Sequence, residues 1–291
     1  MALGGDLLRR PLASPLHRVR RIALDRPLQA LDDLGTQLWF YLRALGWSWR
    51  TVRRYKREIL RLLAEVALGS GALMVIGGTV GVIFFLTFFT GTEVGLEGFQ
   101  GLNQIGVAEF SGFISAYFNT REIAPLVAGL ALSATVGSGF TAQLGAMRIS
   151  EEVDALEVMG IPSIPFLVTT RMLAGFIAVI PLYIVGLFSS YFATRFIVTG
   201  YFGQSAGTYD HYFHQFLPPG DVLYSFLKVL VFAVCVVLIH CYYGYHASGG
   251  PAGVGVAVGR AVRTAIVVIN VVDFFLSLAI WGAHVTVRIA G

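Results

Sequence analysis

The chain has 291 residues, of which 56% are hydrophobic and only 13% are charged, and its mean hydropathy is +0.71. A soluble domain carries about 25% charged residues, so this composition excludes an ordinary soluble protein and predicts a membrane protein with several spanning helices. The formal net charge of +4 is unevenly distributed, because residues 1–61 hold 13 of the 21 Lys and Arg residues and only five acids. Such a basic block is typical of a cytoplasmic membrane surface and does not indicate nucleic-acid binding.

The N-terminal part of the sequence predicts a helix that lies on the membrane. Residues 1–34 show weak periodicity and are expected to form a cytoplasmic lead. Residues 35–64 place leucines at helical spacing on one face and arginines on the other. Tryptophans suit the headgroup level of a bilayer. Three occur in this stretch, namely Trp39, Trp47 and Trp49. We therefore expect an amphipathic interfacial helix at residues 35–64.

Five apolar runs follow, each longer than the roughly 20 residues that a spanning helix needs. The expected spans are residues 66–92, 123–147, 164–196, 222–246 and 264–287. An all-helical integral membrane fold is therefore predicted. Residues 105–118 are also apolar, but this stretch has only 14 residues and contains Glu109. We expect it to be re-entrant or peripheral.

The basic residues predict the orientation of the chain. If the N-terminus is cytoplasmic, the 13 basic residues before residue 62 and four later arginines all fall on the cytoplasmic side. The later arginines are Arg148, Arg171, Arg260 and Arg263. This arrangement satisfies the positive-inside rule. Five crossings then place the C-terminus outside.

The stretch Met147–Pro162 predicts a short acidic amphipathic helix between the second and third spans. Its two faces carry Ile149, Val153 and Leu156 on one side and Ser150, Glu151, Asp154 and Glu157 on the other. Ser150 is expected to cap the helix, with acids in the first turn where the helix dipole favours them, and Gly160 is expected to end it. We expect this helix at residues 148–160 on the cytoplasmic side. Its two-faced pattern indicates docking to a partner, the alternative being a solvated loop.

The motifs of several other protein classes are absent from the sequence. No GxxxxGK[ST] loop occurs, so the chain is not expected to bind ATP, and no cofactor or metal is expected on it. Asp210, His211 and His214 form a compact set without a further metal ligand, and we interpret them as solvated loop residues. No pair of nucleophile and base is evident. His240 is interpreted as a hydrogen-bonded packing residue.

Asp273 is the one acid inside a predicted span. A carboxylate at mid-membrane is costly unless it is paired, protonated or hydrated, so its presence indicates a functional site. The alternative is a structural hydrogen bond to a neighbouring helix. The expected basic partner is Arg121, which lies next to Glu122. We expect Arg121, Glu122 and Asp273 to mark the polar points of a substrate cavity.

Residues 120–162, TREIAPLVAGLALSATVGSGFTAQLGAMRISEEVDALEVMGIP, resemble the signature of the MlaE/YrbE family of ABC transporter permeases. The diagnostic parts are RExxP, a Gly-Ser pair, GxMR and EExDALExM. The turn SGGPAGVG and the ending VRIAG are similar in particular to the B-type YrbE subunit of actinobacterial Mce lipid-uptake systems. The resemblance implies an MlaE-like permease domain at residues 65–291.

The resemblance also implies partners and a mechanism. A separate ATPase dimer binds ATP and Mg²⁺, and the docking helix is its coupling helix. A second permease completes the membrane part, and MCE-domain proteins on the outer side deliver lipid for import through the plasma membrane. The residues implied in ATPase coupling are Arg148, Glu151, Glu152, Asp154, Ala155, Leu156 and Glu157.

Two positions depart from the family pattern RxGSxxTAE. Thr135 stands where Arg is usual, and Gln143 stands where Glu is usual. A homodimer would lose both groups from both halves, so the departures favour a heterodimer with an unlike permease. Two other functions stay open at this point. One is an intramembrane lipid-modifying enzyme that uses Asp273 with a histidine such as His240, and the other is a structural membrane scaffold for the MCE assembly.

Overall fold

The computed structural model describes residues 32–68 and 78–282, and every regular element in these two ranges is helical. The chain divides into two compact units, Met1–Arg43 and Ala44–Gly291. In the first unit, residues 32–43 are helical. The second unit contains all of the elements described below.

The N-terminal amphipathic stretch is divided into several helices, so the prediction of a single helix at residues 35–64 is wrong. A turn at residue 47 precedes α2 (Ser48–Arg54), and Tyr55 separates α2 from α3 (Lys56–Leu68). Tyr55 leaves helical geometry, with φ −117° and ψ 34°, and its ring packs edge-on against Phe166 at 5.3 Å. Periodicity alone does not reveal this break, which coincides with the contact between Tyr55 and Phe166.

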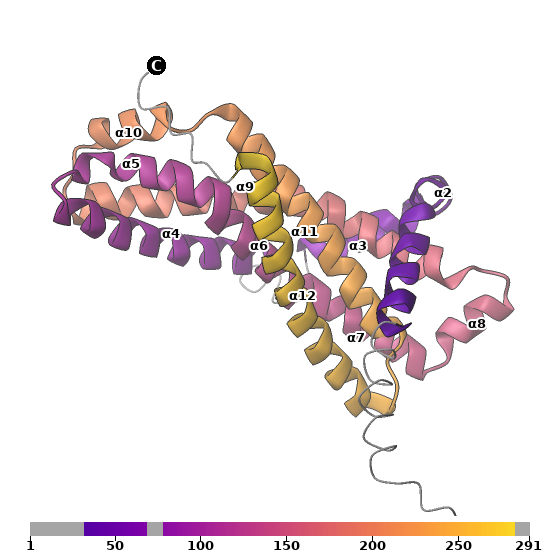
Figure 1. The fold of residues 1–291 in the computed structure, drawn as a ribbon. Coiled ribbons are helices and arrows are strands. Elements are labelled where there is room, and N and C mark those ends of the chain that lie inside the picture. Colours follow the sequence, from indigo (N-terminus) through magenta and orange to yellow (C-terminus); the bar gives the residue numbers. More distant parts are fainter. Residues whose placement is uncertain (1–31, 69–77, 283–291) are drawn as a thin grey trace, which may run out of the picture. The chain divides into compact units, whose positions relative to one another are not determined.

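The prediction of an all-helical fold with five long apolar helices is confirmed. Each of the five is long and apolar enough to cross a membrane. Their bounds are Thr79–Gln104, Ala108–Ile149, Ile164–Tyr201, Pro219–Tyr245 and Gly250–Trp281. Figure 1 shows the first of them, α4 (Thr79–Gln104), running alongside α9 (Thr170–Phe196), which forms the middle of the third.

The first long helix begins and ends later than the expected span at residues 66–92. Its last 12 residues, 93–104, include Glu93 and Glu97, which we had taken to lie beyond the span. Both acids are exposed, whereas Gly91 and Gly95 on the same helix are buried against α9. A Cβ on Gly91 would lie 2.5 Å from the backbone oxygen of Ser190, so the two helix backbones meet closely there. Charge marked the end of the uncharged run but not the end of the helix.

The stretch that we expected to be re-entrant, residues 105–118, belongs largely to the second long helix. That helix runs without a break through η2 (Ala108–Phe110), α5 (Ser111–Ile114), η3 (Ser115–Ile123), α6 (Ala124–Leu132), η4 (Ser133–Gly137) and α7 (Ser138–Ile149). Several of the polar residues that interrupt its apolar pattern are buried by neighbouring helices, whereas Glu109 at its start is exposed. Asn119, for example, is fully buried and donates to the Thr194 hydroxyl at 2.9 Å. The segments η3 and η4 are π-helical, a geometry that is frequent at functional sites.

The third long helix consists of η5 (Ile164–Thr169), α9 and η6 (Ile197–Tyr201). The polar segment after it, which we expected to be a loop, contains α10 (Ala206–Gln215). The last two long helices are α11 (Pro219–Tyr245) and α12 (Gly250–Trp281), which pack against each other. The last helix starts at residue 250 rather than 264, because Gly249 and Gly250, with φ of +87° and +71°, make the turn in only a few residues. Expected residues 283–287 lie outside the described part.

Candidate functional site

The acidic docking segment forms a shorter helix than expected. Helix α8 spans Glu152–Val158, whereas Arg148 still belongs to α7. Ser150 does not cap α8, so that prediction is wrong. It ends α7, and Glu151 after it takes the left-handed conformation with φ 60°. The two helices therefore meet in a tight turn. The expected end of the helix at Gly160 is consistent with its φ of +73°.

Three acids of this segment, Glu152, Asp154 and Glu157, have partners within the chain. Arg148 pairs with Asp154 at 2.5 Å, which ties the end of α7 to α8. Ser150 donates to the Glu152 carboxylate at 2.9 Å. Ser163 donates to Glu157 at 2.5 Å. These contacts fix the position of α8 relative to α7 and to the start of the third long helix.

The outward surface of α8 carries its acids, as the helical wheel predicted, and two apolar residues at the end of the helix are exposed beside them. Val153, on the predicted apolar face, is fully buried and serves the core of the protein. Val158 and Met159 instead point to solvent with 89% and 66% of their surface exposed. Two large apolar side chains beside exposed acids form a surface suited to binding another protein. Both residues belong to the run LEVMG, which lies inside the helix expected at residues 148–160, but neither was assigned to one of its two predicted faces.

A charged cluster lies among η3, α11 and α12, and at its centre is Lys228, whose side chain is fully buried. The Lys228 ammonium lies 2.7 Å from Asp273 Oδ1 and 3.3 Å from Glu122 Oε2. It also donates to the Arg121 backbone carbonyl at 2.6 Å and to the Ser277 hydroxyl at 2.8 Å. A buried ammonium requires such partners, because a lone charge in an apolar interior is very costly.

A second ion pair completes the charged cluster. The Arg121 guanidinium lies 2.7 Å from Asp221 Oδ2, and the indole N–H of Trp281 donates to the other oxygen of that carboxylate at 2.9 Å. The guanidinium also lies over the ring of Tyr117, 4.2 Å from its centre. The charged cluster as a whole consists of Arg121, Glu122, Asp221, Lys228 and Asp273.

An open cavity of about 220 Å³ borders the charged cluster. Arg121 and Glu122 line it, as we expected, but Asp273 is not among its lining residues. The lining consists of Tyr117, Arg121, Glu122, Phe274, Ser277, Leu278, Trp281 and Gly282. Charged groups on one side and aromatic and aliphatic groups on the other give the cavity an amphipathic wall. Such a wall can hold a molecule with a polar head and an apolar body.

The partner that we predicted for Asp273 is wrong. Asp273 pairs with Lys228, and Arg121 pairs with Asp221. Arg121 and Glu122 are consecutive residues of η3 and meet different partners, because successive side chains of a helix point in different directions. Sequence spacing does not reveal which partner each of them meets. The sequence alone could have identified Lys228 as a candidate site residue, because it is the only Lys, Arg, Asp or Glu in the apolar run 222–246. An ionisable residue inside a spanning segment is a functional candidate in the same way as Asp273.

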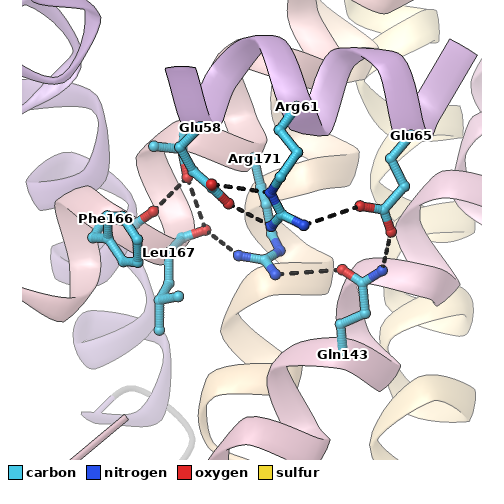
Figure 2. A network of polar contacts seen from close by, with 8 residues as sticks. Glu58, Arg61, Glu65, Gln143, Phe166, Leu167 and Arg171 are labelled. Atoms are coloured by element: carbon cyan, nitrogen blue, oxygen red, sulfur yellow. Dashed lines mark hydrogen bonds and ion pairs between the residues drawn. The ribbon is translucent and has the colours of Figure 1, made fainter. Parts of the chain in front are cut away.

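The second family departure, Gln143, lies in another polar network, which Figure 2 shows. Its amide N–H donates to Glu65 on α3 at 2.5 Å, and its amide oxygen accepts from Arg171 on α9 at 3.3 Å. Arg61 on α3 binds Glu58 at 2.6 Å, and its hydrogen bond holds the pKa of Glu58 below the ordinary value. The network thus joins α3, α7 and α9.

The first departure, Thr135, makes a local contact. Its hydroxyl donates to the backbone carbonyl of Ala131 within the same helical stretch, at 2.8 Å. His240 is fully buried, and its ring nitrogens lie 2.9 Å from the Ser133 hydroxyl and 2.8 Å from the Thr141 hydroxyl. These contacts join α11 to η4 and α7. The His240 side chain is therefore hydrogen-bonded on both nitrogens, as a packing histidine would be.

The Asp210 and histidine set lies on α10 and not in a loop. Asp210 accepts two hydrogen bonds from Arg195, at 2.8 and 2.9 Å, and these bonds lower the pKa of its carboxyl. His214 lies 2.8 Å from the Asp210 backbone carbonyl, which can only accept, so Nδ1 of His214 carries the proton. The pair joins α10 to the end of α9 at an exposed position.

Comparison with known proteins gives a family and several relatives. The family described as "Permease MlaE" matches residues 69–279 of the chain. A "Probable ABC transporter permease protein" of Rickettsia bellii is 29% identical over 67% of the chain and 76% of its own length. The "Protein TRIGALACTOSYLDIACYLGLYCEROL 1, chloroplastic" of Arabidopsis thaliana is 29% identical over 68% of the chain and 57% of its own length. The "Intermembrane phospholipid transport system permease protein MlaE" of Haemophilus influenzae is 27% identical over 69% of the chain and 78% of its own length.

Proposed function

Because the chain belongs to the MlaE permease family, we propose that it is the membrane half of a transporter that moves phospholipid-like molecules with energy supplied by a separate ATPase. The chain is a multi-pass inner-membrane permease of the ABC type and is not itself an enzyme. The phospholipid substrate is proposed because one relative is named for phospholipid transport. The charged cluster and its cavity offer a physical basis for handling such a substrate.

The single observation that carries the proposal is the amphipathic cavity beside the charged cluster. Two cations, Arg121 and Lys228, face three carboxylates, so the cluster has a formal net charge of −1. Arg121 is the cation that lines the cavity, and a guanidinium matches the geometry of a phosphate. Phe274 and Leu278 line the same cavity and suit an acyl chain. A phospholipid combines these two chemistries in one molecule.

Coupling to the ATPase is assigned to α8 and to the turn before it. The exposed Val158 and Met159 would insert into a groove of the ATPase, with Glu151, Glu152 and Ala155 around them. The contacts of Arg148 with Asp154 and of Ser163 with Glu157 would pass a displacement of α8 to the second and third long helices. ATP and Mg²⁺ would bind to the partner ATPase, with no cofactor on this chain.

Further partners follow from the resemblance to B-type YrbE subunits. The second permease would be an unlike chain that supplies the Arg and Glu replaced here by Thr135 and Gln143. MCE-domain proteins on the outer side would deliver lipid, and the direction would be import, with the N-terminus of the permease cytoplasmic and its C-terminus outside. Expressed without the unlike permease, this chain should fail to recruit ATPase. A stable, ATPase-active homodimer would contradict the heterodimer.

The two other functions named above have little support in the geometry. An intramembrane enzyme would need Asp273 and His240 to act together, but Asp273 pairs with Lys228 and His240 binds Ser133 and Thr141. A protein that served only as a scaffold and carried no lipid would not need an amphipathic cavity beside buried charges. The relatives are named as transport permeases.

The proposal is tested by removing the cavity cation from the permease in its complex with the ATPase, reconstituted in phospholipid vesicles. Loss of a hydrogen bond to a charged group costs about 1.5–3 kcal/mol, so Arg121→Gln should slow ATP-driven phospholipid transfer about ten- to hundredfold. Arg121→Lys should retain part of the rate. Arg195→Gln is the matched control, because Arg195 also binds an aspartate but lies outside this cavity. Equal transfer by Arg121→Gln and wild type would refute the assignment.

A further inference from the structure

Arg171 is a buried cation with an unusual set of partners. Only 4% of its surface is exposed, so its charge needs compensation. Its Nη1 donates to the Leu167 backbone carbonyl at 2.9 Å, and its Nη2 donates to the Gln143 side chain at 3.3 Å. Its Nε has no hydrogen-bond partner within the described residues. Both of its polar partners are neutral, although a buried guanidinium is best matched by a carboxylate.

Gln143 lies between Arg171 and the carboxylate of Glu65 and contacts both (Figure 2). An amide has one accepting and one donating end. The Gln143 oxygen accepts from Arg171, and the Gln143 nitrogen donates to Glu65 at 2.5 Å. The amide is thus oriented by a positive group on one side and a negative group on the other. Neither a carboxylate nor an ammonium at position 143 could make both contacts.

We propose that Gln143 is a positioning residue that links the carboxylate of Glu65 on α3 to the buried Arg171 on α9. These three residues form a polar network, called the latch below, that holds α3 to α7 and α9. The family pattern places Glu at position 143, on α7. In this chain the carboxylate that Gln143 contacts is on α3, and the residue on α7 is a neutral bridge. Glu65 and Gln143 therefore form one unit, and neither tolerates a change of charge alone.

The latch lies between the segment that contacts the ATPase and α3, so it should affect transport. This inference rests on the function proposed above. Gln143 is five residues before Arg148, which binds Asp154 of α8. On the other side, α3 packs its Ile59 and Leu62 against Ala174 of α9. A displacement of α8 would reach α7 through Arg148 and then α3 through Gln143. The latch would thus make α3 move with the coupling segment.

The first test exchanges the charges and uses the purified chain in detergent, so it does not depend on transport. Gln143→Glu would set a second carboxylate against that of Glu65, and Arg171 at 3.3 Å from position 143 and Arg61 at 4.0 Å from Glu65 offset the repulsion only in part. Sharing a proton relieves the rest of the repulsion between two adjacent carboxylates. We expect its melting temperature to be about 3–8 °C below wild type at pH 8 and to approach wild type at pH 5. The double variant Glu65→Gln with Gln143→Glu should restore the melting temperature at pH 8 and remove the pH dependence.

The matched control is Gln215→Glu, which makes the same charge change at an exposed position at the end of α10. It should melt like wild type at both pH values. A double variant that is no more stable than Gln143→Glu alone would overturn the latch, because rescue by the exchanged charge is its central prediction. Equal stability of Gln143→Glu and wild type at pH 8 would overturn it as well.

The second test measures coupling in the vesicle-reconstituted complex. Gln143→Glu at pH 8 should raise the number of ATP molecules hydrolysed per phospholipid transferred, and the double variant should restore the wild-type ratio. An unchanged ratio in Gln143→Glu would remove the link between the latch and coupling. If wild-type complex moves no phospholipid, the proposed function fails, whereas the charge-exchange result in detergent stands independently.

Discussion

Replacement of Asp273 by Asn tests whether the buried Lys228 depends on that carboxylate. The change keeps the shape of the side chain but removes the charge 2.7 Å from the ammonium. Removing one partner of a buried ion pair typically costs about 3–5 kcal/mol. Here the ammonium keeps the Glu122 carboxylate at 3.3 Å and its bonds to Ser277 and the Arg121 carbonyl. We therefore expect a smaller loss of about 2–3 kcal/mol in the free energy of unfolding.

The loss should appear as a lower melting temperature of the purified protein. For a chain of this size, about 1 kcal/mol shifts the melting temperature by roughly 2–4 °C, so Asp273→Asn should melt about 4–12 °C earlier. Lys228→Met should be at least as damaging, because it leaves Glu122 and Asp273 without their shared cation. Since Asp273 does not line the cavity, we expect reduced assembly together with reduced transport, and not the loss of transport alone that the sequence suggested.

A double-mutant cycle gives the decisive measurement. If Asp273 and Lys228 stabilise each other, the double variant Asp273→Asn with Lys228→Met should lose less stability than the sum of the two single losses. The expected coupling is about 1–3 kcal/mol, within the range for contacting charged residues. Additive losses would show that the two side chains do not depend on each other. That result would refute the account of the charged cluster given above.

Three further predictions concern the surfaces of the protein. Reversing the charges of Glu152 and Glu157 together should reduce coupling to the ATPase in the reconstituted complex, and normal co-purification with normal lipid uptake would contradict the docking role of α8. Asp210 has a lowered pKa, so its pair with Arg195 should stabilise the protein above the usual Asp pKa of 3.8 and lose that effect as the pH falls below it. The melting temperature of Asp210→Asn should therefore change less between pH 7 and pH 3 than that of wild type. Equal changes in the two proteins would refute the effect. A cysteine at Gln215 should react with a membrane-impermeant reagent from outside and one at Ser248 should not, whereas protection at Gln215 would contradict the orientation.

The sequence determined the class of fold because apolar length is a local property. Five apolar runs predicted five long helices, and the described residues contain five. The signature around Met147–Pro162 likewise indicated the family, whose match covers residues 69–279. Gly160 was recognised as the end of the docking helix, since a positive φ favours glycine whatever the surroundings. The sequence singled out Asp273, Arg121 and Glu122 because charges inside or beside apolar runs are costly, and their role in the substrate cavity stays a prediction.

The tertiary structure decided where the helices end and which charges pair. Helix α4 continues through Glu93 and Glu97 because its buried glycines pack against α9 while the acids stay exposed. Lys228 lies 45 residues from Asp273 along the chain, and only the packing of α11 against α12 brings them within 2.7 Å. Partner choice within a cluster of charges depends on distances between helices, which local sequence does not encode. For the same reason Gln143, a departure in the sequence, acquires its role only from Glu65 and Arg171 beside it.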